Sequence, residues 1–192
     1  MLIEPISSES ATVSQRAALE AARSRFGRDI APAAVIARHD AIMTAVGGFE
    51  AALRRADRLP GRLSHLVNLK VAALLGCSFC IDIGSHIARQ DGVSADAVAD
   101  LPRFRDSDAY SPAERAALAT AEVMTVGDCV LEPTLQQALR EHFDEAQLVE
   151  LLAVIAWENY RSRFNRAAGM QAAGFCPVSE RAASEQPGAN GR

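Results

Sequence analysis

Two cysteines separated by two residues, Cys77 and Cys80, stand in the stretch GCSFCIDIGSHIAR (residues 76–89). The thiolate is the reactive form of cysteine, and the unpaired backbone N–H groups of a helix N-terminus favour it. Gly76 ends the preceding apolar segment, so Cys77 is predicted to stand at the start of the next helix. The two sulfurs can then form a disulfide within one helical turn. The spacing suits a redox cycle in which one cysteine attacks and the other resolves the intermediate.

Two other interpretations of this pair stay open. Cysteine also packs as a small hydrophobic residue, so both thiols could simply belong to the core. Half of a zinc site is a weaker alternative, because such a site needs four ligands and the sequence has no second Cys-x-x-Cys. The remaining cysteines, Cys129 and Cys176, are isolated and are expected to pack rather than to bind a metal.

The composition is that of a soluble globular protein, because 49% of the 192 residues are hydrophobic and 23% are charged. A net charge of −4 argues against a nucleic-acid partner, which would need clustered Lys and Arg. No apolar run reaches the length of a membrane span, and the N-terminus lacks the features of a secretory signal. We therefore expect a cytoplasmic protein, in which a Cys-x-x-Cys pair is more often catalytic or metal-binding than structural.

The elements that must position the cysteines are all predicted to be helices. Apolar residues recur at helical spacing, as in Leu63, Leu66 and Val67, and no segment alternates as a strand does. The motif SPAE at 111–114 is typical of a helix start with a capping box. The glycine pair at 47–48 is expected to end a helix that begins near residue 31.

We predict one all-α domain, a helical bundle of roughly eight helices over residues 1–176. Residues 177–192 are small and polar and are expected to form a flexible tail. Segment 148–157 is apolar on more than one side, and large apolar patches rarely stay exposed on a monomer. The chain is therefore expected to form a homo-oligomer, a dimer or a trimer.

Residues 63–98, LSHLVNLKVAALLGCSFCIDIGSHIARQDGVSADAV, resemble the signature helix pair of the carboxymuconolactone decarboxylase superfamily, in its alkylhydroperoxidase D-like branch. The matching features are a Leu-Val-x-Leu-x-Val-Ala helix, Gly-Cys-x-Phe-Cys-Ile-Asp, the Ala-Arg that follows, and Gly-Val-Ser entering the next helix. The signature region spans residues 62–100, and the C-terminal helices match less specifically. The resemblance implies an all-α and usually oligomeric fold.

The resemblance also implies a function for the two cysteines. In the peroxidase-active relatives such a pair reduces hydroperoxides, and a dithiol reductant or carrier protein recycles it. The usual attacking cysteine of those relatives corresponds to Cys80, which leaves Cys77 as the resolving cysteine. The implied activity is that of a thiol-dependent peroxidase, an oxidoreductase with peroxiredoxin activity. It needs no bound cofactor beyond the redox-active pair.

The sequence departs from the proton relay of these relatives at both of its positions. They carry a glutamate twelve residues before the first cysteine, where this chain has His65, and a histidine four residues after the second, where it has Gly84. His65 could replace the relay, because the pKa of a histidine is ordinarily near neutrality. A partly exposed histidine without a role is the alternative. His86 is disfavoured, because its position lies about 120° around the helix from Cys80.

Glu158 is the second candidate for the relay, because it falls on an apolar face of the last predicted helix. A carboxylate there is either paired, with Arg161 or Arg163, or able to transfer protons, and structural pairing is the favoured interpretation. Asp82 is expected to support the first turns of its own helix, where negative charge is favoured.

Two other functions stay open beside the peroxidase. The missing relay leaves room for a non-catalytic or redox-sensing helical oligomer of the same superfamily. A decarboxylase or lactone enzyme like the family's namesake is less favoured, because that branch does not rely on such a dithiol. A thiol titration before and after peroxide separates the two thiol-based functions from the decarboxylase.

Overall fold

The computed structural model describes residues 1–176, and every regular element within them is a helix. The prediction of an all-α fold is therefore confirmed, with nine α-helices and one 3₁₀ helix in this range. The described residues form two compact units. The tail predicted at 177–192 lies outside the described residues.

Unit 1 consists of Met1–Asp57 and Asn165–Met170. Three helices that pack against one another lie in its first segment: α1 (Val13–Phe26), α2 (Ala31–Ile36) and α3 (Asp40–Arg55). The buried amide of Gln15 joins them, since it donates to the carbonyl of Ala37 at 2.8 Å and to the carboxylate of Asp40 at 3.1 Å. A polar side chain thereby fixes the short connection between α2 and α3.

Helix α3 contains the glycine pair at which the sequence analysis predicts a break, and that prediction is wrong. The interruption lies earlier, because α2 ends at Ile36 and His39 caps α3. The ring Nδ1 of His39 accepts a hydrogen bond from the backbone N–H of Ile42 at 3.4 Å. A glycine inside a helix costs only about 1 kcal/mol relative to alanine, so a well-capped helix can run through Gly47 and Gly48.

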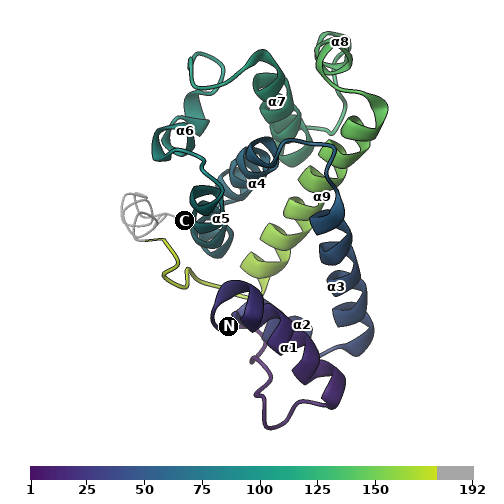
Figure 1. The fold of residues 1–192 in the computed structure, drawn as a ribbon, viewed down its shortest axis with the longest axis vertical. Coiled ribbons are helices and arrows are strands. Elements are labelled where there is room, and N and C mark those ends of the chain that lie inside the picture. Colours follow the sequence, from purple (N-terminus) through teal and green to yellow (C-terminus); the bar gives the residue numbers. More distant parts are fainter. Residues whose placement is uncertain (177–192) are drawn as a thin grey trace, which may run out of the picture. The chain divides into compact units, whose positions relative to one another are not determined.

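Unit 2 comprises Arg58–Phe164 and, among the described residues, 171–176. Its helices are α4 (Gly61–Leu75), α5 (Ser78–Gln90), α6 (Ala95–Ala99), the 3₁₀ helix η1 (Leu101–Arg103), α7 (Pro112–Val126), α8 (Pro133–His142) and most of α9 (Glu145–Ala167). Helix α4 lies against both α5 and α7 (Figure 1) and fully buries Leu66, Val67 and Val71. Burying such a side chain stabilises a fold by about 1.5–3 kcal/mol, so α4 gives α5 a rigid support.

The turn from α4 to α5 depends on Gly76, whose φ of 63° lies in the left-handed region that glycine adopts without strain. The backbone N–H of Cys77 donates to the carbonyl of Ala72 at 3.0 Å and closes this helix end. Cys77 is then the N-cap of α5. The predicted place of Cys77 at a helix start is confirmed.

Helices α4 and α5 approach each other closely at Gly84. A Cβ atom added to Gly84 would lie 3.1 Å from Cδ2 of Leu69, a buried side chain of α4. That distance is shorter than an ordinary van der Waals contact, so any side chain at this position requires Leu69 to move. The close packing of α5 on α4 thus favours glycine at this position.

Asp82 of α5 holds the segment 171–176, which reaches α5 after the end of α9 (Figure 1). Its fully buried carboxylate accepts backbone N–H bonds from Ala173 at 2.8 Å, Phe175 at 3.1 Å and Cys176 at 2.7 Å. Hydrogen bonds to an ionised group contribute roughly 1.5–3 kcal/mol each. Asp82 thus joins two distant segments, and the role predicted for it in the first turns of its own helix is wrong.

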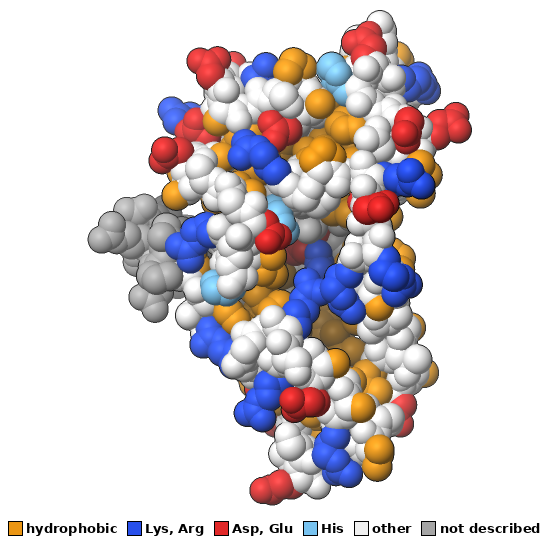
Figure 2. Space-filling model, in the orientation of Figure 1, with side chains coloured by type: hydrophobic (Ala, Val, Ile, Leu, Met, Phe, Trp, Pro, Cys, Tyr) orange, Lys and Arg blue, Asp and Glu red, His pale blue; other side chains and the backbone are white. Residues whose placement is uncertain are grey.

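The surface carries charges of both signs. On the face shown in Figure 2, acidic and basic side chains occur together, with hydrophobic side chains between them. Within residues 1–176, no helix combines the length and the hydrophobicity needed to cross a membrane.

The contact at Gly84 predicts an unusual response to alanine. Alanine in a helix interior normally adds about 1 kcal/mol of stability over glycine, but overpacking costs about 1–3 kcal/mol. We expect Gly84→Ala to leave the free energy of unfolding in urea unchanged or lower it. Gly47→Ala is the matched control, because no atom lies within 4 Å of its added Cβ, and it should stabilise. An equal increase in the free energy of unfolding from both substitutions would contradict the close packing. In a Leu69→Ala background, Gly84→Ala should stabilise the protein as Gly47→Ala does.

The contacts of Asp82 predict the effect of a neutral substitute. Asn keeps one acceptor but turns an NH₂ group toward backbone donors, so Asp82→Asn should lower the free energy of unfolding by about 2 kcal/mol. Hydrogen exchange should show the amides of 173, 175 and 176 losing protection. Asp108→Asn, at an exposed aspartate, is the control and should change neither quantity. Unchanged protection at the three amides would refute the assignment.

Candidate functional site: a buried dithiol beside a paired carboxylate

Cys77 and Cys80 form a disulfide at the N-terminus of α5, with their Cα atoms 5.2 Å apart. This separation lies within the usual range of about 4.4–6.8 Å for bridged cysteines. Both residues are buried, with exposed fractions of 1% for Cys77 and 7% for Cys80. The helix thus brings together the two thiols that the sequence predicts as a redox pair, in a setting screened from bulk water.

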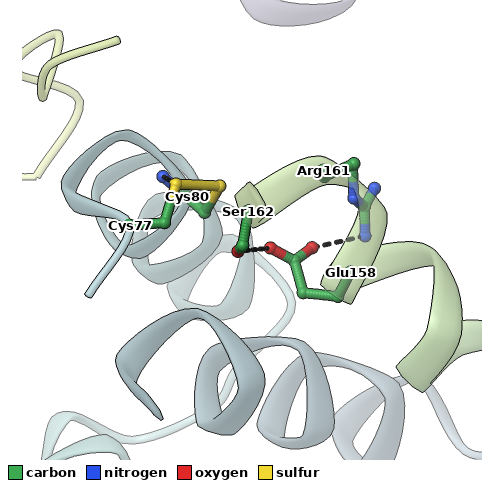
Figure 3. The surroundings of a disulfide bond; sticks show 5 residues. All are labelled: Cys77, Cys80, Glu158, Arg161 and Ser162. Carbon is green, nitrogen blue, oxygen red and sulfur yellow. Dashed lines mark hydrogen bonds and ion pairs between the residues drawn. A yellow bond between two sulfur atoms is a disulfide. The ribbon is translucent and has the colours of Figure 1, made fainter. Parts of the chain in front are cut away.

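The two sulfur atoms have different surroundings. Sγ of Cys77 accepts a hydrogen bond from the backbone N–H of Cys80 at 3.3 Å, as an N-cap acceptor does. Negative charge on this sulfur is therefore stabilised by the helix N-terminus. Sγ of Cys80 lies on the side of the disulfide that faces Ser162 (Figure 3). The helix N-terminus thus stabilises a thiolate on Cys77, whereas the side chain of Ser162 lies on the side of Cys80.

Glu158 of α9 belongs to the surroundings of the disulfide (Figure 3). Its side chain is buried, with 4% of the residue exposed, and its Oε2 lies 2.7 Å from Nη2 of Arg161. Nη2 of Arg161 also donates to Oδ1 of Asn68 on α4 at 3.3 Å. A buried carboxylate needs such pairing to stay ionised, and the structure provides it. The other partner considered for Glu158, Arg163, donates instead to the carbonyl of Thr125 at 3.1 Å.

The second oxygen of this carboxylate bonds a residue that the sequence analysis missed. The hydroxyl of Ser162, which is fully buried, donates to Oε1 of Glu158 at 2.8 Å. In Figure 3 this side chain lies between the disulfide and Glu158. The signal was present in the sequence, because residues four apart share a helix face and Ser162 follows Glu158 by four.

His65 lies at the opposite end of α5 from the dithiol. Its Nε2 is 2.7 Å from Oδ2 of Asp91, the residue that follows the last residue of α5. At 1.5 Å per residue, about 16 Å of helix separates Asp91 from Cys80. The structure therefore brings Glu158, but not His65, to the surroundings of the disulfide.

The remaining polar candidates also lie elsewhere. The ring of His86 contacts that of Phe175 in segment 171–176, with a centroid distance of 5.6 Å. Cys129 is exposed and Cys176 is buried, and both lie outside the disulfide. Among residues 1–176, no group of three or more His, Cys, Asp or Glu side chains is arranged to hold a metal ion. The arrangement that can do chemistry is the dithiol with Ser162 and Glu158.

Comparison with known sequences places this site in a family. The pattern of the carboxymuconolactone decarboxylase family matches residues 40–123, which include both cysteines. The uncharacterized protein YnjA of Escherichia coli (strain K12) is 33% identical over 128 residues. The aligned region covers 67% of this chain and 70% of YnjA.

Solved structures share the fold over most of the chain. The debrominase Bmp8 superposes with a TM-score of 0.82 at 23% identity, covering 93% of this chain and 96% of its own. An uncharacterized peroxidase-related protein from Ralstonia eutropha JMP134, with an alkylhydroperoxidase AhpD core, gives a TM-score of 0.77 at 19% identity, covering 89% and 91%. At these identities the similarity establishes the fold alone. By its sequence match to YnjA and its family pattern, the chain belongs to the carboxymuconolactone decarboxylase family, and it shares the fold of an alkylhydroperoxidase AhpD core.

Proposed function

We propose that the protein is a thiol-dependent oxidoreductase that reduces hydroperoxides with Cys77 and Cys80. The observation that carries the proposal is the disulfide between these cysteines at a helix N-terminus, in surroundings that include a buried, paired carboxylate. A dithiol that only packed in the core would not need an ionisable group beside it. Burying such a group is unfavourable unless it is paired, and its pairing with Arg161 keeps an ionisable carboxylate in the surroundings of the dithiol.

The proposed reaction transfers two electrons from the dithiol to the peroxide. The Cys80 thiolate attacks one peroxide oxygen, the O–O bond breaks, and the alcohol leaves after taking up a proton. Cys80 is now a sulfenic acid. The sulfur of Cys77 attacks the sulfur of Cys80, and the hydroxyl group leaves with the proton of Cys77 as water. One hydroperoxide and two thiols thus give one alcohol, one water and one disulfide.

An external dithiol would return the disulfide to its reduced form. A thiolate of that reductant attacks the sulfur of Cys80, and Cys77 leaves as a thiolate stabilised by the helix N-terminus. The second thiol of the reductant then releases Cys80. This cycle needs no bound cofactor, and the reductant could be a small dithiol or a carrier protein.

A homo-oligomer remains our proposal for the assembly. In the single chain Val149 and Leu152 of α9 are exposed, with exposed fractions of 69% and 37%. Both lie in the segment for which the sequence predicts a subunit contact. A second copy of the chain would cover these apolar side chains.

Reductive dehalogenation is a second candidate function. It is favoured by the similarity to the debrominase fold, which extends over 93% of this chain. A variant of that debrominase, with a cysteine replaced by alanine, has been solved in complex with 2,3,4-tribromopyrrole. The same dithiol could supply the two electrons, because an aryl bromide and two thiols give the arene, hydrogen bromide and a disulfide.

Two cysteine substitutions test the assigned roles. The reduced protein treated with cumene hydroperoxide should form the Cys77–Cys80 disulfide, as seen by peptide mass spectrometry. Cys80→Ser should abolish the reaction, whereas Cys77→Ser should stop at a sulfenic acid on Cys80 that dimedone traps. Cys129→Ser is the matched control, because that cysteine is exposed and lies outside the pair, and it should behave as the wild type.

Other outcomes of this experiment identify the alternatives. A sulfenic acid trapped on Cys77 in the Cys80→Ser variant would reverse the two roles. Bromide release from a brominated pyrrole by a protein that is inert to hydroperoxide would favour the dehalogenase. If all four thiols stay titratable with both substrates, the dithiol is not a catalytic pair and the proposed function is wrong.

A further inference from the structure

We propose that Ser162 carries the proton between Cys80 and Glu158, so that this relay on α9 replaces the one missing at His65 and Gly84. The inference rests on the proposed function, since it supplies the proton transfers that the dithiol reaction requires. It assigns a role to a residue outside the signature region of the family.

The direction of the hydrogen bond suits a relay. A serine hydroxyl has one proton to donate and two lone pairs that accept. Ser162 donates its proton to Oε1 of Glu158 at 2.8 Å, so its oxygen is left to accept a proton. Figure 3 shows the side chain of Ser162 between the disulfide and Glu158, on the side of Cys80. The proton of the Cys80 thiol can pass to Oγ while the hydroxyl proton passes to Glu158.

Burial makes such a path necessary. Cys80 and Glu158 are almost completely buried and Ser162 is completely so, which keeps bulk water from taking the proton directly. The ion pair of Glu158 with Arg161 at 2.7 Å stabilises the ionised carboxylate, which is the form that accepts a proton. Arg161 therefore acts as a positioning residue, and its bond to Asn68 fixes it against α4.

The contact of Ser162 differs from the usual bond of a buried hydroxyl in a helix. Serine and threonine inside helices commonly bond the backbone carbonyl four residues earlier. Thr120 of α7 does so, because its hydroxyl donates to the carbonyl of Ala116 at 2.9 Å. Ser162 instead bonds the side chain of the residue four positions earlier, and that residue is an ionisable acid. A hydroxyl that donates to a backbone carbonyl of its own helix does not require a carboxylate as acceptor.

Each group of the relay regains its starting protonation state after one reaction. During attack the proton of Cys80 moves to Ser162 and that of Ser162 moves to Glu158. The alkoxide leaving from the peroxide then takes a proton from Ser162, which recovers its own from Glu158. The carboxylate is ionised again and the serine is neutral, so the relay is ready for the next reaction.

Alkylation of Cys80 tests the relay without any peroxide. In the Cys77→Ser background, we measure the rate of reaction of Cys80 with iodoacetamide against pH by peptide mass spectrometry. General base assistance is typically worth at least about 100-fold, so Ser162→Ala should slow alkylation at pH 7 by roughly 10- to 100-fold. The deficit should vanish near pH 10, because a free thiol with a pKa of about 8.5 is then ionised without help.

Four further variants separate a relay from a structural effect. Ser162→Thr keeps the hydroxyl and should retain most of the rate at pH 7. Thr120→Val is the matched control, because it removes a buried helix hydroxyl that is not in the relay, and it should leave the rate unchanged. Glu158→Gln should reproduce the deficit of Ser162→Ala, and the double variant should be no slower than either, because groups that act as one unit are not additive.

The failures of the two proposals are distinguishable. A deficit that persists unchanged at pH 10, or two deficits that multiply in the double variant, would overturn the relay. A Ser162→Ala variant that is alkylated as fast as its parent would also overturn the relay. The proposed function would still stand in that case if hydroperoxide oxidised Cys77 and Cys80 to the disulfide. If Ser162→Ala does not fold, the pH profile of Glu158→Gln decides in its place. If the variants show the expected alkylation rates but the protein does not react with hydroperoxide, only the proposed peroxidase function is refuted.

Discussion

The site in unit 2 depends on the constraint that a carboxylate removed from water must be paired or hydrogen-bonded. Glu158 satisfies it with Arg161 and Ser162 of its own helix, and Arg161 joins α9 to α4 through its hydrogen bond to Asn68. Asp82 satisfies it with backbone N–H groups of segment 171–176, and so fixes that segment on α5. The two buried charges thus belong to contacts that join a further segment to α4 and to α5.

The difference between the two sulfurs follows from the same local physics. A backbone amide at the start of α5 stabilises charge on Cys77, whereas the side chain of Ser162 lies on the side of Cys80. A dithiol needs both properties, because one sulfur must be activated for attack and the other must leave readily when the disulfide is reduced. Placing the pair across the first turn of a helix supplies both from a single element.

Local features of this protein were predictable from its sequence. The capping box at Ser111 and the place of Cys77 after Gly76 depend on residues within a few positions of each other, and both are as predicted. What failed depended on distant partners. No local pattern could show that Asp82 bonds residues 91 to 94 positions away, or that His65 pairs with Asp91 across two helices. The helix face of Glu158 is predictable from the apolar pattern around it, and its bond to Ser162 follows the i, i+4 spacing of one helix.

The central claim is that the two cysteines act together as a two-electron donor to a hydroperoxide. Its most direct test is the stoichiometry of a single turnover, in which the fully reduced wild-type protein receives less than one equivalent of cumene hydroperoxide without any reductant. The account predicts that two thiols are lost for each molecule of cumyl alcohol formed, both from the peptide that contains residues 77–80. Alcohol formed without loss of those two thiols, or thiols lost without alcohol, would contradict it.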